Sequence, residues 1–323
     1  MRICVVGAGA IGGWIGAWFA RAGHEVGLIA RGGHLDALRE KGLTLESGGG
    51  RETFRVKASD EPADFGAQDA VFICLKTYSI AAMLPRLAPL IGADTMVIPA
   101  INGLPWWYFH REGGRFDGAR IDCLDPRGEM LAVLAPHRIV GCVVHASAEV
   151  VAPGVIRHNG GDRFIVGEPD RSISSRIERL AEAMNAAGFK TEITPDIRTE
   201  IWTKLVGNLS YNPVAALTLA RMQEINGNPE LLALIRALIE ETMRVAEAHG
   251  VRVPMTVEER IGITKALGNA KISMHQDVEK RRPLEVEAIV GAVAELARKA
   301  GVATPMIDIV HALIAERARH LGG

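Results

Sequence analysis

Three polar residues recur at every fourth position between Ile201 and Pro213, and together they could act on a carbonyl group. They are Lys204, Asn208 and Asn212, one cation and two amides. In an α-helix each step of four residues drifts by only about 40°, so all three would lie on one face. A lysine can protonate an oxygen that gains charge, and amides suit its polar substituents. The alternative is an ordinary solvated helix face with a surface lysine.

The stretch that must carry this stripe reads as a helix. Pro195-Asp196 is a helix-start signal, with Asp196 as the expected N-cap. Pro213 lacks a backbone N–H, so the helix is expected to end or kink there. The apolar sides of the helix are expected to come from Trp202, Leu205, Val206 and Leu209.

A glycine-rich turn near the amino terminus points to a dinucleotide. The apolar run 2–6 suits a buried parallel strand, the helical pattern 11–22 follows, and 25–30 reads as a second strand. Between the first strand and the helix lies a G-x-G-x-x-G sequence in its proper βαβ context. The predicted cofactor-binding residues of this turn are Gly7, Ala8, Gly9, Ala10, Ile11 and Gly12.

The residue after the second strand bears on the choice of cofactor. NAD enzymes usually carry an acid there, which binds the ribose 2′-hydroxyl. This chain has Arg31 instead, and no acid follows until Asp36. Because a guanidinium can hold a 2′-phosphate with bidentate, charge-assisted bonds, the sequence favours NADPH. The alternative is a surface arginine at a loop start.

Two further polar residues follow predicted buried strands. Lys76 follows the strand 69–75, and Asn102 follows the strand 96–100. Open α/β sheets bind their ligands at the carboxyl ends of strands, so both are candidate site residues. The alternative for each is a plain loop residue.

The remaining patterns divide the chain into two predicted domains. A hairpin is expected at 43–47 and 53–56, antiparallel strands at 138–145, 154–158 and 163–167, a helix at 172–187 and a last strand at 190–194. After Asp196 only helical patterns occur, at 229–249, 256–268, 283–300 and 304–319. We therefore predict an α/β fold, with a Rossmann-like NADP-binding domain at 1–195 and an all-helical substrate and catalytic domain at 196–323.

Composition narrows the classes of partner. The 323 residues carry a net charge of −1, which gives no electrostatic case for nucleic acid or an anionic membrane. No apolar run reaches the roughly 18 residues of a membrane span, and no signal peptide is recognisable. The four cysteines show no metal spacing, and Cys4, Cys74 and Cys142 lie in apolar runs. A protein of a reducing compartment, the cytoplasm, is expected, with a small-molecule partner and no metal.

The last group of candidate site residues is the stretch Ser273-Met-His-Gln-Asp277, which is followed by Glu285. Pro283 is expected at the first position of a helix, which would put Glu285 in the first turn. A carboxylate is favoured at a helix start in any case, so this placement does not by itself indicate catalysis.

Taken together, these residues resemble the ketopantoate reductase (2-dehydropantoate 2-reductase) family over nearly the whole chain. The motifs that carry the resemblance are the N-terminal glycine turn with Arg31, Leu75-Lys76-Thr77, Asn102-Gly103, the Lys204/Asn208/Asn212-Pro213 stretch, and Ser273–Asp277 with Glu285. The family reduces a 2-oxo acid with NADPH in a cleft between a Rossmann domain and a helical domain.

The resemblance implies a role for each matching residue. Lys204 would be the general acid, and Glu285 would be a second catalytic residue. Lys76, Asn102 and Glu285 would also lie at the cofactor. The implied reaction converts 2-dehydropantoate to pantoate, a step of pantothenate biosynthesis, and the resemblance is compatible with a homodimer. The residues that would hold the substrate are Asn102, Asn208, Asn212 and Ser273.

Other functions stay open at the level of sequence. One is a related reductase of a different 2-oxo acid, because Asn102-Gly103 is followed by the aromatic run Leu104-Pro-Trp-Trp-Tyr-Phe109. If Pro105 begins a helix, one of Trp106 and Trp107 would face the cleft. A second is an NADP-dependent 3-hydroxy acid dehydrogenase. A third is a non-catalytic NADPH sensor, which would have no need of Lys204.

Overall fold

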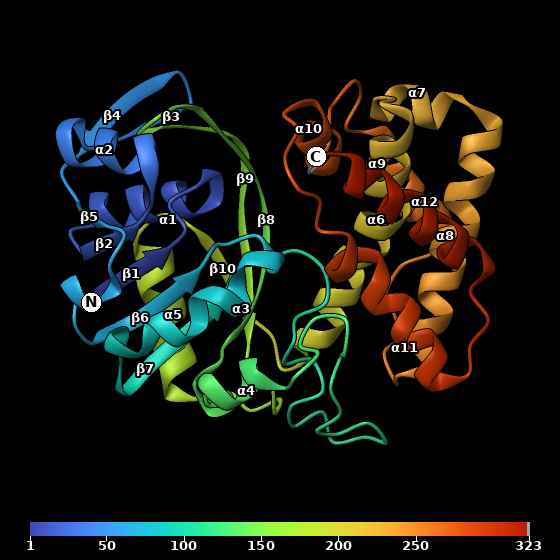
Figure 1. The fold of residues 1–323 in the computed structure, drawn as a ribbon, viewed down its shortest axis with the longest axis horizontal. Helices are drawn as coiled ribbons and strands as arrows, with labels where there is room; N and C mark the ends of the chain where they lie inside the picture. The colour runs from blue at the N-terminus through green and yellow to red at the C-terminus, as the bar shows by residue number, and fades with distance from the viewer. Residues whose placement is uncertain (322–323) are drawn as a thin grey trace. The chain divides into compact units, whose positions relative to one another are not determined.

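The computed structural model describes residues 1–321, which divide into two compact units. Unit 1 comprises Met1–Ile101 and Glu129–Ile197, and unit 2 comprises Asn102–Gly128 together with the chain from Arg198 onward. The sequence-based division at 195/196 differs from these units chiefly in the segment 102–128. Each unit is described below by itself (Figure 1).

Unit 1 is built on a parallel five-stranded sheet in the order β5-β2-β1-β6-β7. Its strands are β1 (Arg2–Val6), β2 (Glu25–Ile29), β5 (Lys57–Ser59), β6 (Gln68–Ile73) and β7 (Ile91–Pro99). The register pairs Val6 with Ile29 and with Ile73, so these three strands end at one edge. The chain leaves β1 in the middle of the sheet, with β2 on one side and β6 on the other, which is the topological switch point of a dinucleotide-binding fold.

A second sheet completes unit 1, in the order β10-β9-β3-β4 with β8 paired to β9. Its strands are β3 (Leu43–Ser47), β4 (Gly50–Phe54), β8 (Gly141–Ala152), β9 (Val155–Gly167) and β10 (Lys190–Ile193). Helix α1 (Ala10–Arg21) packs against β1 and β2 of the first sheet and against β3, β8 and β9 of the second. α1 therefore lies between the two sheets and is buried from Gly12 to Phe19.

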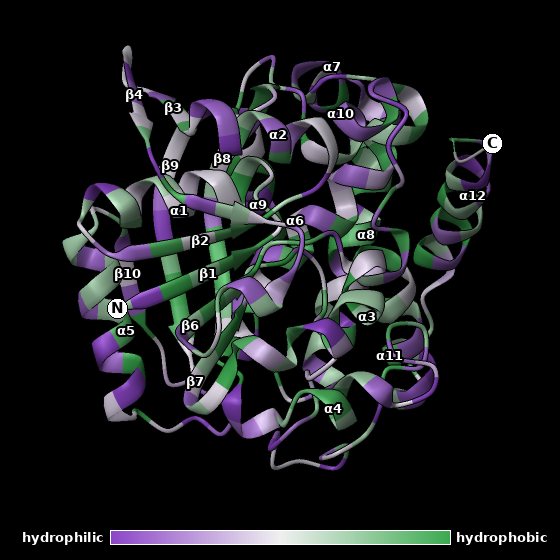
Figure 2. Cartoon of the chain, turned by 60° about the vertical axis from the view of Figure 1, so that its left-hand side comes forward, coloured by the Kyte–Doolittle hydropathy of each residue, from purple (hydrophilic) through white to green (hydrophobic). Residues whose placement is uncertain are grey.

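The core of unit 1 follows from this layering. β1 and β6 are hydrophobic along most of their length (Figure 2), and both are central strands covered on two faces. Trp14 of α1 stacks on His158 and Phe164, and the resulting aromatic cluster fills the space toward the second sheet. The remaining helical segments of unit 1 are α2 (Gly32–Lys41), η1 (Pro62–Asp64), η2 (Thr77–Ser79), α3 (Ile80–Met83), η3 (Leu84–Leu90), α4 (Glu129–Val133), η4 (Pro136–Arg138) and α5 (Ser175–Ala186).

Unit 2 is helical apart from the irregular segment 102–128. α8 packs against four other helices of the unit, α7, α9, α11 and α12. No helix among residues 1–321 is both long enough and apolar enough to cross a membrane. The helices are α6 (Ile197–Thr218), α7 (Met222–Gly227), α8 (Pro229–Ala248), α9 (Val257–Lys265), α10 (Ser273–Glu279), the π-helix η5 (Glu287–Gly291), α11 (Ala292–Ala300) and α12 (Pro305–Leu321).

The predicted fold class, α/β with a Rossmann-like domain followed by helices, is confirmed, but three local predictions are wrong. α6 does not end at Pro213 but continues to Thr218, because residues 209–216 are buried and their packing outweighs one lost backbone bond. The alternative of a kink at Pro213 stays a prediction. The strands expected at 154–158 and 163–167 form one strand, β9. Gly160 and Gly161 produce an irregularity in its pairing with β8 where a turn was expected. The helix expected from Pro283 begins at Val286 and opens with the π-turn, so Glu285 precedes it.

Candidate active site

The glycine turn after β1 has the geometry that its spacing predicts. Gly7 has φ +98°, which a side chain would strain, and the N–H groups of Gly7 and Ala8 both donate to the Ile29 carbonyl of β2. A Cβ on Gly12 would lie 2.1 Å from the Gly7 carbonyl oxygen. Only glycine at position 12 therefore lets α1 approach the turn this closely.

The start of α1 is suited to an anion. Gly9 is the N-cap of α1 and offers no side-chain cap, so the first backbone N–H groups of the helix lack that partner. A Cβ built on Gly9 would meet nothing within 4 Å. The backbone at Gly9 is thus open to close approach by a pyrophosphate, and these features fit a dinucleotide bound at residues 7–12.

Two basic residues follow neighbouring strands at the same edge of this sheet. Arg31 is exposed and is the N-cap of α2, two residues after β2 ends. Lys76 is half-buried and precedes η2, three residues after β6 ends. Because β1, β2 and β6 end in register, both cations belong to the edge that carries the glycine turn.

In unit 2, α6 presents only a narrow accessible stripe. From Ile201 to Ala216 every residue is buried except Thr203, Lys204 and Asn208, which are half-buried. The predicted face of α6 therefore exists, and Lys204 and Asn208 form its accessible part. Asn212, at the end of the stripe, is buried.

Lys204 is held by Asn102. The Lys204 ammonium donates a hydrogen bond of 2.8 Å to the Asn102 Oδ1 atom. Since an ammonium can only donate, the amide oxygen of Asn102 must face it, and the amide NH₂ is directed elsewhere. The pair thus holds a cation, which can donate a proton, in a defined position on the accessible stripe of α6.

The segment that brings Asn102 to Lys204 docks on the stretch after Glu285. Leu104 N–H donates to the Ala288 carbonyl at 2.8 Å, and a Cβ on Gly103 would lie 2.2 Å from that carbonyl oxygen. Gly103 has φ +82°, so glycine is required there on two counts. Glu285 is buried and lies three residues before Ala288. Asn102, Lys204 and Glu285 are therefore carried by segments of unit 2 in direct contact.

No sequence pattern indicates the residues that anchor this segment to α6. The buried Arg198 guanidinium donates to the carbonyl oxygens of Tyr108 and His110, at 2.8 and 2.7 Å. Trp202 Nε1 donates to the Tyr108 hydroxyl at 2.7 Å. A buried arginine cannot be distinguished from a surface one by spacing alone, and its partners are about 90 residues away along the chain.

Asn212 and Ser273 form a second pair. Asn212 Oδ1 accepts a bond of 3.3 Å from the Ser273 hydroxyl and a longer one of 3.5 Å from the Met274 N–H group. Asn212 is only 4% exposed and its oxygen faces the first turn of α10. The structure thus brings these two predicted substrate residues together, and it uses the Asn212 oxygen to position α10.

The aromatic run after Gly103 belongs to the core. Residues 106–111 form turns with no α-helix, and Trp106 and Trp107 are each only 2% exposed. The expectation that Pro105 begins a helix with one tryptophan facing the cleft is wrong, because neither helical spacing nor exposure is present. No pocket role follows for either side chain.

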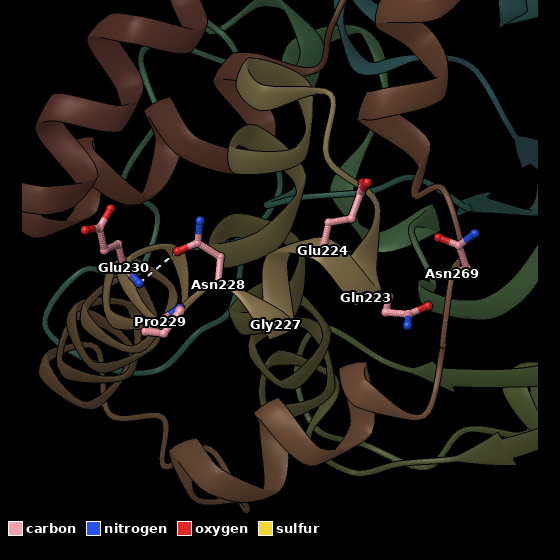
Figure 3. Close-up of a pocket in the computed structure, with 7 residues that line it drawn as sticks. All are labelled: Gln223, Glu224, Gly227, Asn228, Pro229, Glu230 and Asn269. Atoms are coloured by element: carbon pink, nitrogen blue, oxygen red, sulfur yellow. Dashed lines mark hydrogen bonds between the residues drawn. The ribbon is translucent and has the colours of Figure 1, made fainter.

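A surface hollow and a buried cysteine are two other features that could bear on function, and neither belongs to the group of predicted site residues described above. A surface hollow of about 850 Å³ at the junction of α7 and α8 contains none of the predicted site residues (Figure 3). Its Asn228 caps α8 by accepting from the Glu230 N–H group at 2.9 Å. Residues 1–321 contain no cluster of three metal-ligating side chains. Burial raises the pKa of the Cys4 thiol to about 12, so this cysteine is no nucleophile.

The fold and the arrangement of these residues define a dinucleotide-dependent oxidoreductase with an added helical domain. Two family models agree with this assignment. The model described as "Ketopantoate reductase PanE/ApbA" matches residues 3–107, and that of the C-terminal part of the same family matches residues 196–318. The chain belongs to the ketopantoate reductase family, which confirms the resemblance inferred from its motifs.

Individual relatives support the same conclusion. A 2-dehydropantoate 2-reductase of Mesorhizobium japonicum is 43% identical over 323 residues, covering 100% of this chain and 99% of the relative. The crystal structure of a candidate ketopantoate reductase from Ralstonia solanacearum MolK2 is 38% identical, with a TM-score of 0.95 and coverage of 99% and 98%. That of a 2-dehydropantoate 2-reductase from Geobacter metallireducens GS-15 is 28% identical, with a TM-score of 0.86 and coverage of 98% and 100%.

Proposed function

We propose that this protein reduces a 2-oxo acid to a 2-hydroxy acid with NADPH, and that its substrate is 2-dehydropantoate, which becomes pantoate. The observation that carries the proposal is the hydrogen bond between Lys204 and Asn102 on the one accessible stripe of α6. The relatives named above support the choice of substrate, because those with an assigned reaction are 2-dehydropantoate 2-reductases.

The chain's own residues divide the work of the reaction. Bound NADPH supplies a hydride to the carbonyl carbon of the substrate. Lys204 donates a proton from Nζ to the carbonyl oxygen, and Asn102 orients the ammonium for that transfer. Asn208, Asn212 and Ser273 hold the polar groups of the substrate, and Glu285 completes the site as the second catalytic residue.

The choice of NADPH over NADH rests on the end of β2. Arg31 is exposed there, where an NAD enzyme would place a carboxylate. Its guanidinium would bind the 2′-phosphate, the pyrophosphate would lie at the start of α1, and Lys76 would lie near the nicotinamide. A homodimer and a cytoplasmic location stay predictions.

The experiment is a screen of NADPH oxidation, followed at 340 nm, over a panel of 2-oxo acids that includes 2-dehydropantoate. We expect 2-dehydropantoate to give the highest kcat/KM and pantoate to be the product identified by mass spectrometry. The preference of another 2-oxo acid by orders of magnitude would refute the substrate. Oxidation of a 3-hydroxy acid with NADP⁺, in the absence of 2-oxo acid reduction, would refute the reaction.

A further inference from the structure

Arg260 of α9 covers a glycine of α6 beside the proposed active site. A Cβ on Gly207 would lie 2.1 Å from Nη2, 2.2 Å from Cζ and 2.4 Å from Nε of Arg260. Three atoms of the guanidinium thus surround one point above the Gly207 backbone. Any side chain at position 207 would displace the group, so glycine is what admits the arginine.

No carboxylate among the described residues 1–321 pairs with the Arg260 guanidinium. Among residues 1–321 it makes no side-chain hydrogen bond or ion pair, and its Nε atom is buried without an acceptor. Arg236 of α8, by contrast, pairs with Glu258. Burial lowers the pKa of the Arg260 guanidinium, and the nearby Tyr211 phenol offsets part of that effect. A partly buried cation of this kind is stabilised when an anion binds it.

The position of this cation is fixed by a second contact between the same two helices. Thr264, one turn after Arg260, donates to the Tyr211 hydroxyl at 2.7 Å, and Tyr211 lies one turn after Gly207 on α6. α9 is thus held against α6 on both turns. The packing of α9 on α6 therefore fixes the position of the guanidinium.

Gly207 places the guanidinium next to the accessible stripe of α6. It follows Lys204 by three residues and directly precedes Asn208, and residues three apart on a helix are neighbours with Cβ atoms about 5–6 Å apart. A 2-oxo acid carries its keto oxygen and its carboxylate on adjacent carbons. Two cations separated by one helical turn match that arrangement.

We propose that Arg260 binds the carboxylate of the 2-oxo acid while Lys204 acts on the keto oxygen. The inference rests on the proposed function, and it adds a specificity-determining residue to it. Arginine binds a carboxylate through two parallel N–H···O bonds, which selects an acid over a neutral carbonyl compound.

The test compares a 2-oxo acid with its uncharged methyl ester in the wild type, Arg260→Gln and Arg260→Lys. We expect Arg260→Gln to raise KM for the acid by roughly 10- to 100-fold and to leave KM for the ester within about threefold. Arg260→Lys should recover part of the preference. Arg252→Gln, which removes an exposed arginine from the segment before α9, is the control and should behave as the wild type does.

Binding of oxamate, an unreactive mimic of a 2-oxo acid, separates this inference from the proposed function. Calorimetry with saturating NADPH should show oxamate bound at least about tenfold more weakly by Arg260→Gln than by the wild type, whatever the turnover of either protein. Equal binding by the two proteins, or no binding to the wild type at millimolar concentrations, overturns the role of Arg260. A wild type that binds oxamate through Arg260 but reduces no 2-oxo acid refutes the proposed function alone.

Discussion

Gly12 in unit 1 and Gly103 in unit 2 each allow a close backbone contact, the first between residues near in sequence and the second between residues far apart in sequence. At each position a Cβ would strike a backbone carbonyl oxygen, that of Gly7 at 2.1 Å and that of Ala288 at 2.2 Å. The first contact joins residues five apart in one turn, and the second joins segments 185 residues apart. Dinucleotide binding is thus prepared by local backbone geometry, whereas the proposed catalytic pair depends on long-range docking.

The largest expected effect is on kcat, and it comes from the proposed catalytic pair of unit 2. Lys204→Ala should lower kcat by roughly 10²- to 10⁴-fold, because the proton donor to the developing oxyanion is lost. NADPH affinity, measured by fluorescence titration, should stay within a few-fold. Lys265→Ala, which removes an exposed lysine of α9, is the control and should leave kcat unchanged. An unaltered kcat in Lys204→Ala would remove this residue from the mechanism.

The docking contact of the segment 102–128 can be broken directly. Gly103→Ala should lower kcat/KM by about 10- to 100-fold, because the clash with Ala288 displaces Asn102 from Lys204. Gly113→Ala is a matched control, since Gly113 has φ +80° against +82° for Gly103 but its Cβ would meet nothing within 4 Å. Equal losses in both variants would assign the effect to backbone strain and dismiss the docking contact.

Cofactor choice is expected to depend on one side chain of unit 1. Arg31→Ala should reduce the ratio of kcat/KM for NADPH to that for NADH by one to two decades, because a hydrogen bond to a charged group contributes about 1.5–3 kcal/mol. Lys41→Ala, at the far end of α2, should leave the ratio unchanged. An unchanged NADPH/NADH ratio of kcat/KM in Arg31→Ala would show that other residues bind the 2′-phosphate.

The smallest effects should separate two glycines of the same turn. Gly12→Ala should destabilise the protein by about 1–3 kcal/mol through overpacking against the Gly7 carbonyl, measured as a lower denaturation midpoint. Gly9→Ala should change stability by less than about 0.5 kcal/mol and weaken NADPH binding several-fold, because its Cβ enters the space meant for the pyrophosphate. The reverse pattern would contradict the assignment of the anion site to Gly9.

The same contrast explains what could be predicted from the sequence. The strand, glycine turn and helix of residues 2–22 were predictable, because every contact that defines them lies within a short stretch of chain. The accessible face of α6 followed from helical spacing alone. The docking of Gly103 on Ala288 could not be predicted, because no local pattern records a partner far along the chain.

The errors share that origin. The sequence favours a helix from Pro105 with one of Trp106 and Trp107 facing the cleft, but both are buried, because their burial depends on where the segment 102–128 packs. The sequence favours an end or a kink of α6 at Pro213, and the packing of residues 209–216 rules out the end by continuing the helix to Thr218. Arg260 gave no signal at all, since its role depends on Gly207 of another helix. In each case the conformation or the role of the residue depends on tertiary contacts that the local sequence does not indicate.

The central claim, that Asn102 and Lys204 act as one catalytic unit, is tested most directly by a double-mutant cycle. The measurement is kcat/KM for 2-dehydropantoate in the wild type, Asn102→Ala, Lys204→Ala and the double variant. If Asn102 acts by orienting the Lys204 ammonium, the double variant will be within a few-fold of Lys204→Ala. A double variant whose loss equals the product of the two single losses would contradict the claim and make the two residues independent.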